Sequence, residues 1–318
     1  MKKALYRTLL VTIPLILFLI SLELYCEIKI PNSYKLKRTS IENYGNKIKI
    51  LVLGDSHAWN GVNPDQFRQF GFNLSNPTQD IYENQKLLSK TIDQMPNLKI
   101  VLYALSYHTI GYKHEMVGYD WRFCLLLREF SILPENPAII ATKYDFCSYL
   151  TKEGKDPFMN LAFWKKNMEF DYRPSVVREN GWAEATCPNG VTPDAKAAQD
   201  RVKSHEGLIN PALFPINVQR LKEMNQDLNI HKAKLVFITL PISKYFYQYM
   251  TREKYNSIQE EISRLIQEEN IPYYNYIADN RFEDKDFCDF NHLNNAGANK
   301  ISQIINKEVI LPNLSPNR

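Results

Sequence analysis

Hydrophobic runs of β-strand length alternate with segments of helical spacing along much of the chain. Residues 48–53 form a β-branched and leucine run that ends at Gly54, which predicts a buried strand. Apolar residues in 78–95 recur at helical spacing, and Pro96 follows as a stop signal. The remaining pattern predicts, in chain order, strands at 72–74 and 98–105, a helix at 216–228, a strand at 233–240, a helix at 253–269, a strand at 273–277 and a helix at 295–309. Such alternation is typical of an α/β fold with a mostly parallel sheet covered on both faces.

Two segments depart from this alternation. Residues 27–47 are polar and lack clear periodicity, which indicates a tether. Residues 106–210 contain many aromatic side chains but no steady alternation of strands and helices. We interpret them as a large, partly helical insertion after the third strand, folded over one end of the sheet. The expected organisation is therefore an anchor at 1–26, a tether at 27–47 and one domain at 48–318 that includes the insertion.

The first residues are those of a membrane segment. Lys2, Lys3 and Arg7 precede an uncharged, Leu- and Ile-rich run at 8–22. A helix at 4–26 can span a bilayer if Arg7 and Glu23 reach the interfaces. A cleaved signal peptide is the alternative, although Glu23-Leu24-Tyr25 offers no small residues for a cleavage site. The basic N-terminus predicts a single-pass signal anchor in a bacterial cell membrane, with the domain on the periplasmic or extracellular side.

Composition narrows the class of protein. Hydrophobic residues make up 44% and charged residues 23%, and the net charge is only +4, so an ordered globular domain is expected. No arginine-rich run is present, which argues against a nucleic-acid partner. Four cysteines lie beyond Cys26, and the sequence leaves open whether they form disulfides or stay buried free thiols. No spacing of cysteines or histidines indicates a metal site.

Two short motifs carry candidate chemistry. Gly54-Asp55-Ser56-His57 follows the first strand, where the carboxyl end of a parallel sheet presents side chains to ligands. Asp289-Phe290-Asn291-His292 precedes the last helix. A serine becomes a good nucleophile when a histidine held by a carboxylate takes its proton. Alone, the first motif also fits a turn with a helix cap and the second an exposed loop, but together they predict a Ser56, His292 and Asp289 triad.

At these residues the chain resembles the SGNH/GDSL hydrolase superfamily, which has its serine in a GDS motif after the first strand and its Asp and His in a D-x-x-H motif before the last helix. The resemblance covers 48–105 and 230–310. It implies a flavodoxin-like α/β/α sandwich and ester or acyl chemistry that needs no cofactor.

The superfamily's oxyanion donors are matched less closely. The segment at 72–80 takes the place of the second family block but lacks its glycine, so a backbone N–H near Ser75 or the Asn76 side chain is the expected donor. Ser106 and His108 stand where the third block has an asparagine; each is either a donor or a structural residue. His57 is either a substrate or oxyanion contact or a solvent-facing residue at a helix start.

These departures, with the anchor and the insertion, resemble the cell-envelope acyltransferase branch, which includes the D-alanyl transfer protein of teichoic-acid synthesis and the alginate O-acetyltransferases. That resemblance implies a polysaccharide substrate and a membrane-bound O-acyltransferase as partner. Lys244 and Tyr245 begin an aromatic stretch after the 233–240 strand. This stretch would suit sugar rings, or it is ordinary core and rim packing.

The leading hypothesis is therefore an extracytoplasmic, serine-dependent O-acyl transferase, most simply for O-acetylation, or an esterase, acting on a cell-envelope polysaccharide. The triad alone does not separate transferase from esterase. The alternative is a non-catalytic glycan-binding or assembly subunit with the same fold. A lipase-like enzyme acting beside its anchor is a third hypothesis.

Overall fold

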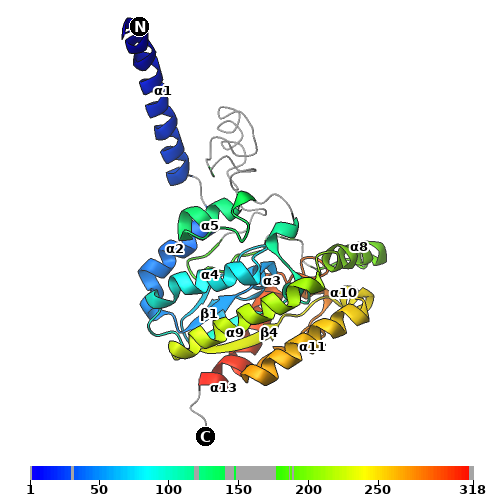
Figure 1. Cartoon of the computed structure of the whole chain (residues 1–318). Coiled ribbons are helices and arrows are strands. Elements are labelled where there is room, and N and C mark those ends of the chain that lie inside the picture. Colours follow the sequence, from blue (N-terminus) through cyan, green and yellow to red (C-terminus); the bar gives the residue numbers. More distant parts are fainter. Residues whose placement is uncertain are drawn as a thin grey trace. The chain divides into compact units, whose positions relative to one another are not determined.

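A five-stranded parallel sheet forms the centre of the fold. The computed structural model describes residues 2–29, 32–117, 122–139, 147, 177–185, 187 and 190–314. All neighbouring strands pair in parallel, in the order β2-β1-β3-β4-β5. Figure 1 labels β1 and β4 in the middle of the fold. The strands are β1 (Ile50–Leu53), β2 (Gly71–Asn73), β3 (Ile100–Ala104), β4 (Lys234–Thr239) and β5 (Tyr273–Asn275). This order is the flavodoxin-like one, so the predicted fold class is confirmed.

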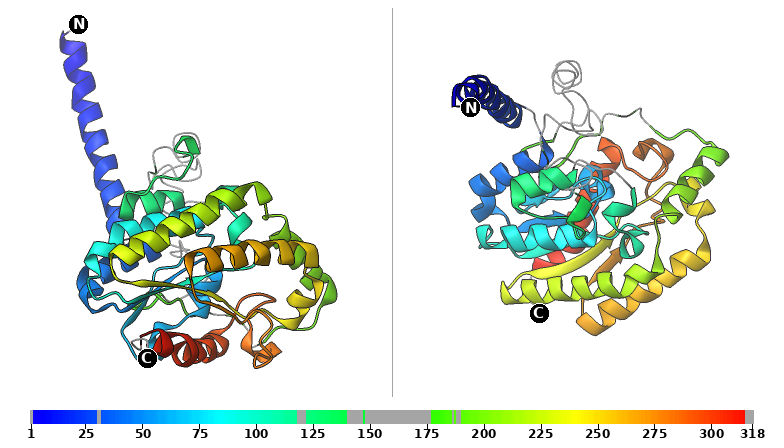
Figure 2. Two further views of the ribbon diagram at one scale, coloured as in Figure 1. Left: turned by 60° about the horizontal axis from the view of Figure 1, so that its bottom comes forward. Right: turned by 45° about the horizontal axis from the view of Figure 1, so that its top comes forward.

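Helices cover both faces of this sheet, as Figure 2 shows for α9 and α11 on one face and α12 on the other. The α4 helix packs against α9, and α3 packs against α12. The helices of this part are α3 (Ser56–Gly61), α4 (Ile81–Thr91), α8 (Ala195–Glu206), α9 (Phe214–Ile230), α10 (Lys244–Tyr249), α11 (Arg252–Glu269), α12 (Asn295–Ile305) and α13 (Leu311–Leu314), with a π-helical turn at Asn306–Ile310. Burial on both faces explains why the central strands are continuous apolar runs.

One core cluster joins the sheet to α12. Alternate residues of the central strands share a face, and they pack with the apolar side of α12 and of the turn after it. Members of this cluster are Ile50, Val52, Ile100, Leu102, Val236, Ile238, Ile301, Ile305 and Val309. The packing fixes α12, and hence the loop that leads into it, relative to β1.

The chain divides into two compact units. Residues 1–35 and 121–172 form unit 1, and residues 36–120 and 173–318 form unit 2, which contains the sheet. The predicted boundaries at 26/27 and 47/48 do not coincide with these unit boundaries. Of the predicted insertion, α5 (Arg122–Phe130) belongs to unit 1, whereas 177–185 and α8 belong to unit 2. The insertion aromatics Tyr119, Trp121, Trp164, Phe170 and Tyr172 lie outside the described residues.

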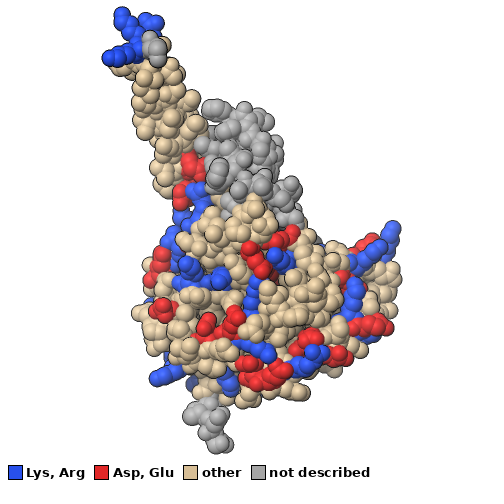
Figure 3. Space-filling view, viewed as in Figure 1, with Lys and Arg blue, Asp and Glu red and all other residues tan. Residues whose placement is uncertain are grey.

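Unit 1 is built on the long apolar helix α1 (Lys2–Lys29). Among the described residues, Lys2–Ile28 is the one stretch long and apolar enough to cross a membrane, and uncharged atoms cover most of α1 in Figure 3. Within the same unit, Arg128 of α5 forms ion pairs with Glu23 at 3.0 Å and Glu27 at 2.8 Å. A disulfide joins Cys124 to Cys147. Part of the insertion is therefore bonded to the end of α1 that follows its apolar run.

The segment expected to be an irregular tether is largely helical. The helix α2 (Ser33–Tyr44) occupies most of 27–47. Its buried residues Tyr34, Lys37 and Ile41 recur at helical spacing. Because one of the three buried positions is a lysine, the sequence does not show a helical spacing of apolar residues here. Burial of Lys37 is tolerated because its ammonium group donates a hydrogen bond to the carbonyl oxygen of Ser75.

A strained turn at Gly54 connects β1 to α3. Gly54 has a φ of +147°, and a Cβ placed there would lie 2.9 Å from Cβ of Ala58 and 3.1 Å from the Ala104 carbonyl oxygen. The side chain of Asn84 on α4 accepts a hydrogen bond from the Gly54 N–H at 3.0 Å. A glycine is needed here because neither the backbone angle nor the space suits a side chain.

Gly54→Ala should therefore destabilise the protein by about 1–3 kcal/mol and displace the neighbouring Ser56. Gly207→Ala is the matched control, because Gly207 has an ordinary helical φ of −66° and a Cβ there would meet nothing closer than 3.4 Å. Chemical denaturation of the two variants measures the difference. Equal stability of both variants would contradict the strained-turn account.

Candidate active site

Ser56 lies at the carboxyl edge of the sheet, where the strand order reverses. It is the first residue of α3, and Asp55 caps that helix by accepting the His57 N–H at 2.9 Å. Because β1 pairs with β2 on one side and β3 on the other, the chain leaves β1 between the ends of both neighbours. Ligands of doubly wound sheets bind at this position.

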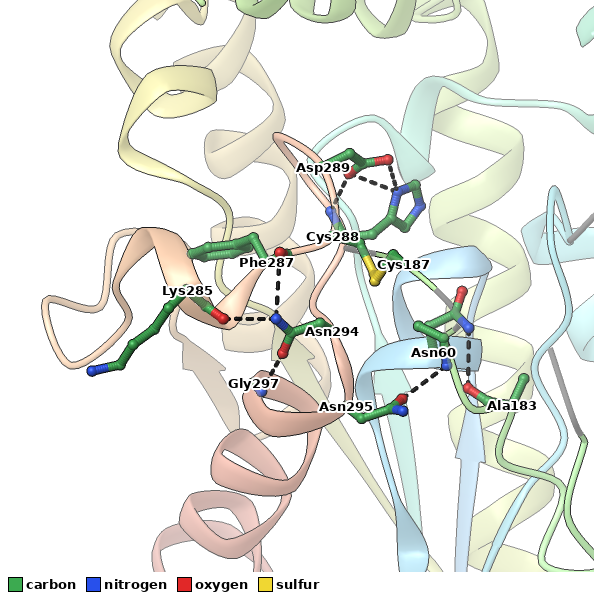
Figure 4. The surroundings of a disulfide bond; sticks show 12 residues. Asn60, Ala183, Cys187, Lys285, Phe287, Cys288, Asp289, Asn294, Asn295 and Gly297 are labelled. Carbon is green, nitrogen blue, oxygen red and sulfur yellow. Dashed lines mark hydrogen bonds and ion pairs between the residues drawn. A yellow bond between two sulfur atoms is a disulfide. The ribbon is translucent and has the colours of Figure 1, made fainter. Parts of the chain in front are cut away.

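The segment with Asp289 and His292 is a tight loop ahead of α12. An antiparallel bridge between Phe287 and Leu293 closes the loop, and Cys288 N–H donates to the His292 carbonyl oxygen at 2.8 Å. Asn294 caps α12 by accepting the Gly297 N–H at 3.0 Å (Figure 4). Since α12 packs against α3, the loop is held beside the start of α3.

A disulfide secures the same loop. Cys288, directly before Asp289, is bonded to Cys187 (Figure 4). The two cysteines are 101 positions apart, and closing a loop of that size in the unfolded chain is worth about 4.7 kcal/mol in the chain-entropy view. The alternative of free thiols at positions 124, 147, 187 and 288 is thus not what the structure contains.

Ser56, His292 and Asp289 are joined by hydrogen bonds in that order. Ser56 Oγ is 2.9 Å from Nε2 of His292, and Nδ1 of His292 is 3.0 Å and 3.1 Å from the two carboxylate oxygens of Asp289. The carboxylate can only accept, so Nδ1 carries the proton and Nε2 is left to accept from the serine hydroxyl. Asp289 also accepts the backbone N–H groups of Asn291 and His292, at 3.0 Å and 2.7 Å. We call these three residues the first row.

The electrostatics of the first row suit a neutral base beside an ionised acid. Burial lowers the pKa of His292, and this effect outweighs the opposing influence of Asp289. Burial raises the pKa of Asp289, but His292 and the Arg201 guanidinium outweigh it and hold that pKa well below its usual range. Near neutral pH the imidazole is therefore ready to accept a proton, and Asp289 is a carboxylate.

Asp55, His57, Ser106 and His108 gather behind the first row. Nδ1 of His57 is 2.9 Å from Asp55 Oδ1 and 2.9 Å from Ser106 Oγ, and Nε2 of His108 is 3.7 Å from Asp55 Oδ2. Burial lowers the pKa of His108 to about 4, although Asp55 opposes the shift. Burial raises the pKa of Asp55, but His57, His108 and Ser106 hold it well below its usual range. Ser106 and His108 thus face Asp55, and His57 is buried instead of facing solvent.

The helix α8 adds residues that the sequence analysis did not identify. Arg201 Nε donates to Asn291 Oδ1 at 2.7 Å, and its guanidinium lies 3.6 Å from Asp289. His205, one turn further along α8, is buried beside His57 and His108, with ring centroids 6.1 Å and 5.1 Å away. No motif marks α8. Asn291 lies inside the second motif, but its position there gave it no predicted role. Although four histidines gather here, no group of three His, Cys, Asp or Glu side chains in the described part of the chain is arranged to hold a metal ion.

Ser75 and Asn76 lie just beyond the end of β2, beside the chain that leaves β1. The N–H and hydroxyl of Ser75 both donate to Asn73 Oδ1, so this backbone N–H is already used. The Asn76 side chain is fully buried, and neither its amide nitrogen nor its oxygen has a hydrogen-bond partner among the described residues. A buried amide without a partner is costly in a folded protein, which makes Asn76 the stronger candidate to meet a substrate oxygen.

Lys244 and Tyr245 begin α10. Lys244 Nζ and the Tyr245 hydroxyl both donate to Asp284, at 3.0 Å and 2.9 Å. The Tyr245 ring meets the edge of Phe290, the residue after Asp289, at a centroid distance of 6.3 Å. Lys244 and Asp284 also line an open hollow of about 370 Å³, together with Phe282 and Phe287. The two residues thus lie beside the loop of Asp289 and not in the first row.

Comparison with known proteins gives distant structural similarity. No protein-family model matches the sequence, and no curated protein shows significant similarity to it. The chain is similar to a GDSL-like lipase from Bacteroides thetaiotaomicron (TM-score 0.41, 10% identity, 88% of this chain and 100% of the other). It is also similar to a lipase/acylhydrolase from Enterococcus faecalis (0.38, 10%, 85% and 100%) and to an acetyl xylan esterase (0.39, 10%, 82% and 100%). We therefore infer function from the geometry of the site itself.

Proposed function

We propose that this chain is a serine-dependent acyl transferase or esterase. The observation that carries the proposal is the first row, in which hydroxyl, imidazole and carboxylate follow one another at 2.9 Å and 3.0 Å. This sequence of groups is what activates a serine for attack on an acyl carbon. The segments expected to supply oxyanion donors differ from the superfamily pattern, but this difference does not change the geometry of the first row.

The reaction has two halves. Ser56 Oγ attacks the carbonyl carbon of an acyl ester while His292 Nε2 takes the hydroxyl proton. His292 returns that proton to the leaving alcohol oxygen as the C–O bond breaks, which leaves an acyl-serine. A sugar hydroxyl or water then attacks the acyl-serine while its proton passes to His292. His292 returns that proton to Ser56 Oγ as the bond between Oγ and the acyl carbon breaks, so both residues are regenerated. Asp289 holds the imidazole and stabilises its positive charge in both halves.

An oxyanion develops on the carbonyl oxygen in each half. Ser56 is the first residue of α3, so its backbone N–H precedes the helix's own hydrogen bonds and points outward. The buried amide of Asn76, just beyond the end of the neighbouring strand β2, has a donor with no hydrogen-bond partner among the residues that the structure describes. These two groups are our candidates for the oxyanion hole, and removing one such donor typically costs about 10²–10³ in rate.

Two features support an extracytoplasmic location. The helix α1 has the length and apolarity of a membrane span, with Lys2, Lys3 and Arg7 at its start. Both disulfides are of the kind that persists in oxidising compartments. An anchored enzyme outside the cytoplasm has the cell envelope as its surroundings, and a membrane-bound O-acyltransferase is a partner able to supply acyl groups there.

A polysaccharide is the substrate class we propose. The hollow beside Lys244 combines two phenylalanines with two lysines, an aspartate and a glutamate, a mixture that suits the apolar faces and hydroxyls of sugar rings. Tyr245, whose hydroxyl donates to Asp284 of this hollow, contacts Phe290, the residue after Asp289. An acetyl group is the simplest acyl group consistent with the proposal.

Hydrolysis of a chromogenic acetyl ester, with and without envelope oligosaccharides, tests this function. Ser56→Ala and His292→Ala should each lower the rate at least about a thousandfold. Ser257→Ala, at an exposed serine of α11, should leave it unchanged. Acetylated sugar would identify a transferase, and acetate alone an esterase. Ester hydrolysis as fast in Ser56→Ala as in the wild type would overturn the serine-dependent mechanism, and cellular function that survives Ser56→Ala would favour the glycan-binding alternative.

The pH dependence of kcat/KM should report His292. The base must be neutral, so activity is lost as the pH falls through its pKa. Since burial lowers that pKa, half-maximal activity is expected below pH 6.5. Asp289→Asn should move this midpoint lower still, because Asp289 favours the protonated ring, and should reduce the maximal rate by about 10⁴. A midpoint above 6.5 in the wild type, or an upward shift in the variant, would contradict the assignment.

A further inference from the structure

A second imidazole lies flat against the catalytic one. The rings of His57 and His292 are stacked, with centroids 4.7 Å apart and planes inclined by 25°. Both side chains are buried. The contact with Ser56 is made by His292. The first row therefore leaves the role of His57 unexplained.

Both ring nitrogens of His57 are engaged. Nδ1 lies 2.9 Å from Asp55 Oδ1, and Nε2 lies 2.9 Å from Nδ2 of Asn291. Arg201 can only donate, and it donates to Asn291 Oδ1, so the NH₂ group of Asn291 must be the one that faces His57. His57 Nε2 consequently accepts, and Nδ1 carries a proton that it can donate to Asp55 Oδ1, with Ser106 Oγ also 2.9 Å from this nitrogen. The hydrogen bonds select one neutral tautomer.

This arrangement forms a second row beside the first, made of Asp55, His57 and Asn291. The two rows interlock because their members alternate along both motifs. Ser56 reaches His292, and the next residue, His57, reaches Asn291, the residue before His292. Two hydrogen bonds thus join the start of α3 to the 289–292 loop. The second bond adds to the constraints that the bridge, the disulfide and the packing of α12 already place on this loop.

Groups from every neighbouring element face these rings. Asp289 lies on the loop itself, Asp55 caps α3, and Ser106 and His108 follow β3. Arg201 and His205 come from α8. Burial lowers the pKa of His205 well below its usual range, and His108 and His57 add to the shift, so it contributes a neutral ring. The charged groups beside the stack are thus Arg201 and the carboxylates of Asp289 and Asp55, whereas the imidazoles of His108 and His205 are neutral.

We propose that Asp55, His57 and Asn291 form a positioning row that holds the imidazole of His292 in register with Ser56. The inference rests on the proposed function for its catalytic consequence. His57 does not act as the base, because its one unprotonated nitrogen is occupied by Asn291. It acts through His292: the stacked ring limits tilting, and the bond to Asn291 holds the loop that carries both Asp289 and His292.

Kinetics with 4-nitrophenyl acetate test the positioning row. His57→Phe keeps a flat ring but removes both nitrogens, and Asn291→Ala removes the bond to the loop. Each should lower kcat about tenfold to a hundredfold, with KM changed by no more than about threefold. His231→Phe, at a partly exposed histidine after α9, is the matched control and should behave as the wild type. An unchanged kcat in both variants, or a change confined to KM, would overturn the proposal.

Nitrogen-15 NMR of the full-length, histidine-labelled protein in detergent gives a readout that needs no active variant. The His57 resonance, assigned by its loss in His57→Phe or by its shift in Asn291→Ala, should show a neutral ring protonated on Nδ1. A ring protonated on Nε2 would overturn the second row even if the enzyme is active. Conversely, if the protein has no Ser56-dependent activity, the proposed function is wrong, but the tautomer of His57 still shows whether the second row exists.

Discussion

The contact between Ser56 Oγ and His292 Nε2 is the interaction on which the functional account depends, and it joins residues 236 positions apart. Neither motif creates it alone. The serine is placed by the strained turn at Gly54 and by the cap of Asp55 on α3. The histidine is placed by a closed loop, the cap of α12 and the packing of α12 on α3. The core between the sheet and α12 is therefore what converts two distant motifs into one site.

Burial gives the site its chemical character. Desolvation disfavours charged imidazoles, so His292, His108 and His205 all have lowered pKa values. The carboxylates of Asp289 and Asp55 remain ionised only because cationic or hydrogen-bonding groups surround them. Two rows of polar groups are thus each satisfied internally, which is the condition for keeping such groups in a core. The site is therefore sensitive to substitution, since removing one member of a row leaves its partners buried and unpaired.

Much of the sheet was predictable because strands buried on both faces read as continuous apolar runs. The predicted strands and the helices after residue 210 correspond to observed elements, with ends displaced by a few residues. Helix α2 was not predicted, because its buried stripe includes Lys37, whose charge is accommodated by a carbonyl oxygen far away in sequence. The contribution of α8 was also invisible, since Arg201 and His205 lie in a helix with a polar sequence and act through tertiary contacts.

Similar limits apply within the site. The sequence pointed to Ser56, His292 and Asp289, and the structure brings these side chains together. It also suggested Ser75 as an oxyanion residue, but the hydrogen bonds from Ser75 to Asn73 occupy the donors that would be needed. His57 was expected to contact substrate or solvent, whereas its partners are Asp55, Ser106, Asn291 and the ring of His292. Which hydrogen-bond partners a side chain finds depends on the folded geometry, and the spacing of residues along the sequence does not reveal it.

Covalent labelling with a serine-directed fluorophosphonate, followed by mass spectrometry of the peptides, tests the central contact most directly. If an imidazole activates this hydroxyl, the probe will modify Ser56 in the wild-type protein, and His292→Ala will abolish that modification while leaving the protein folded. Failure to modify Ser56, or equal modification in the two proteins, would show that the serine is not an activated nucleophile.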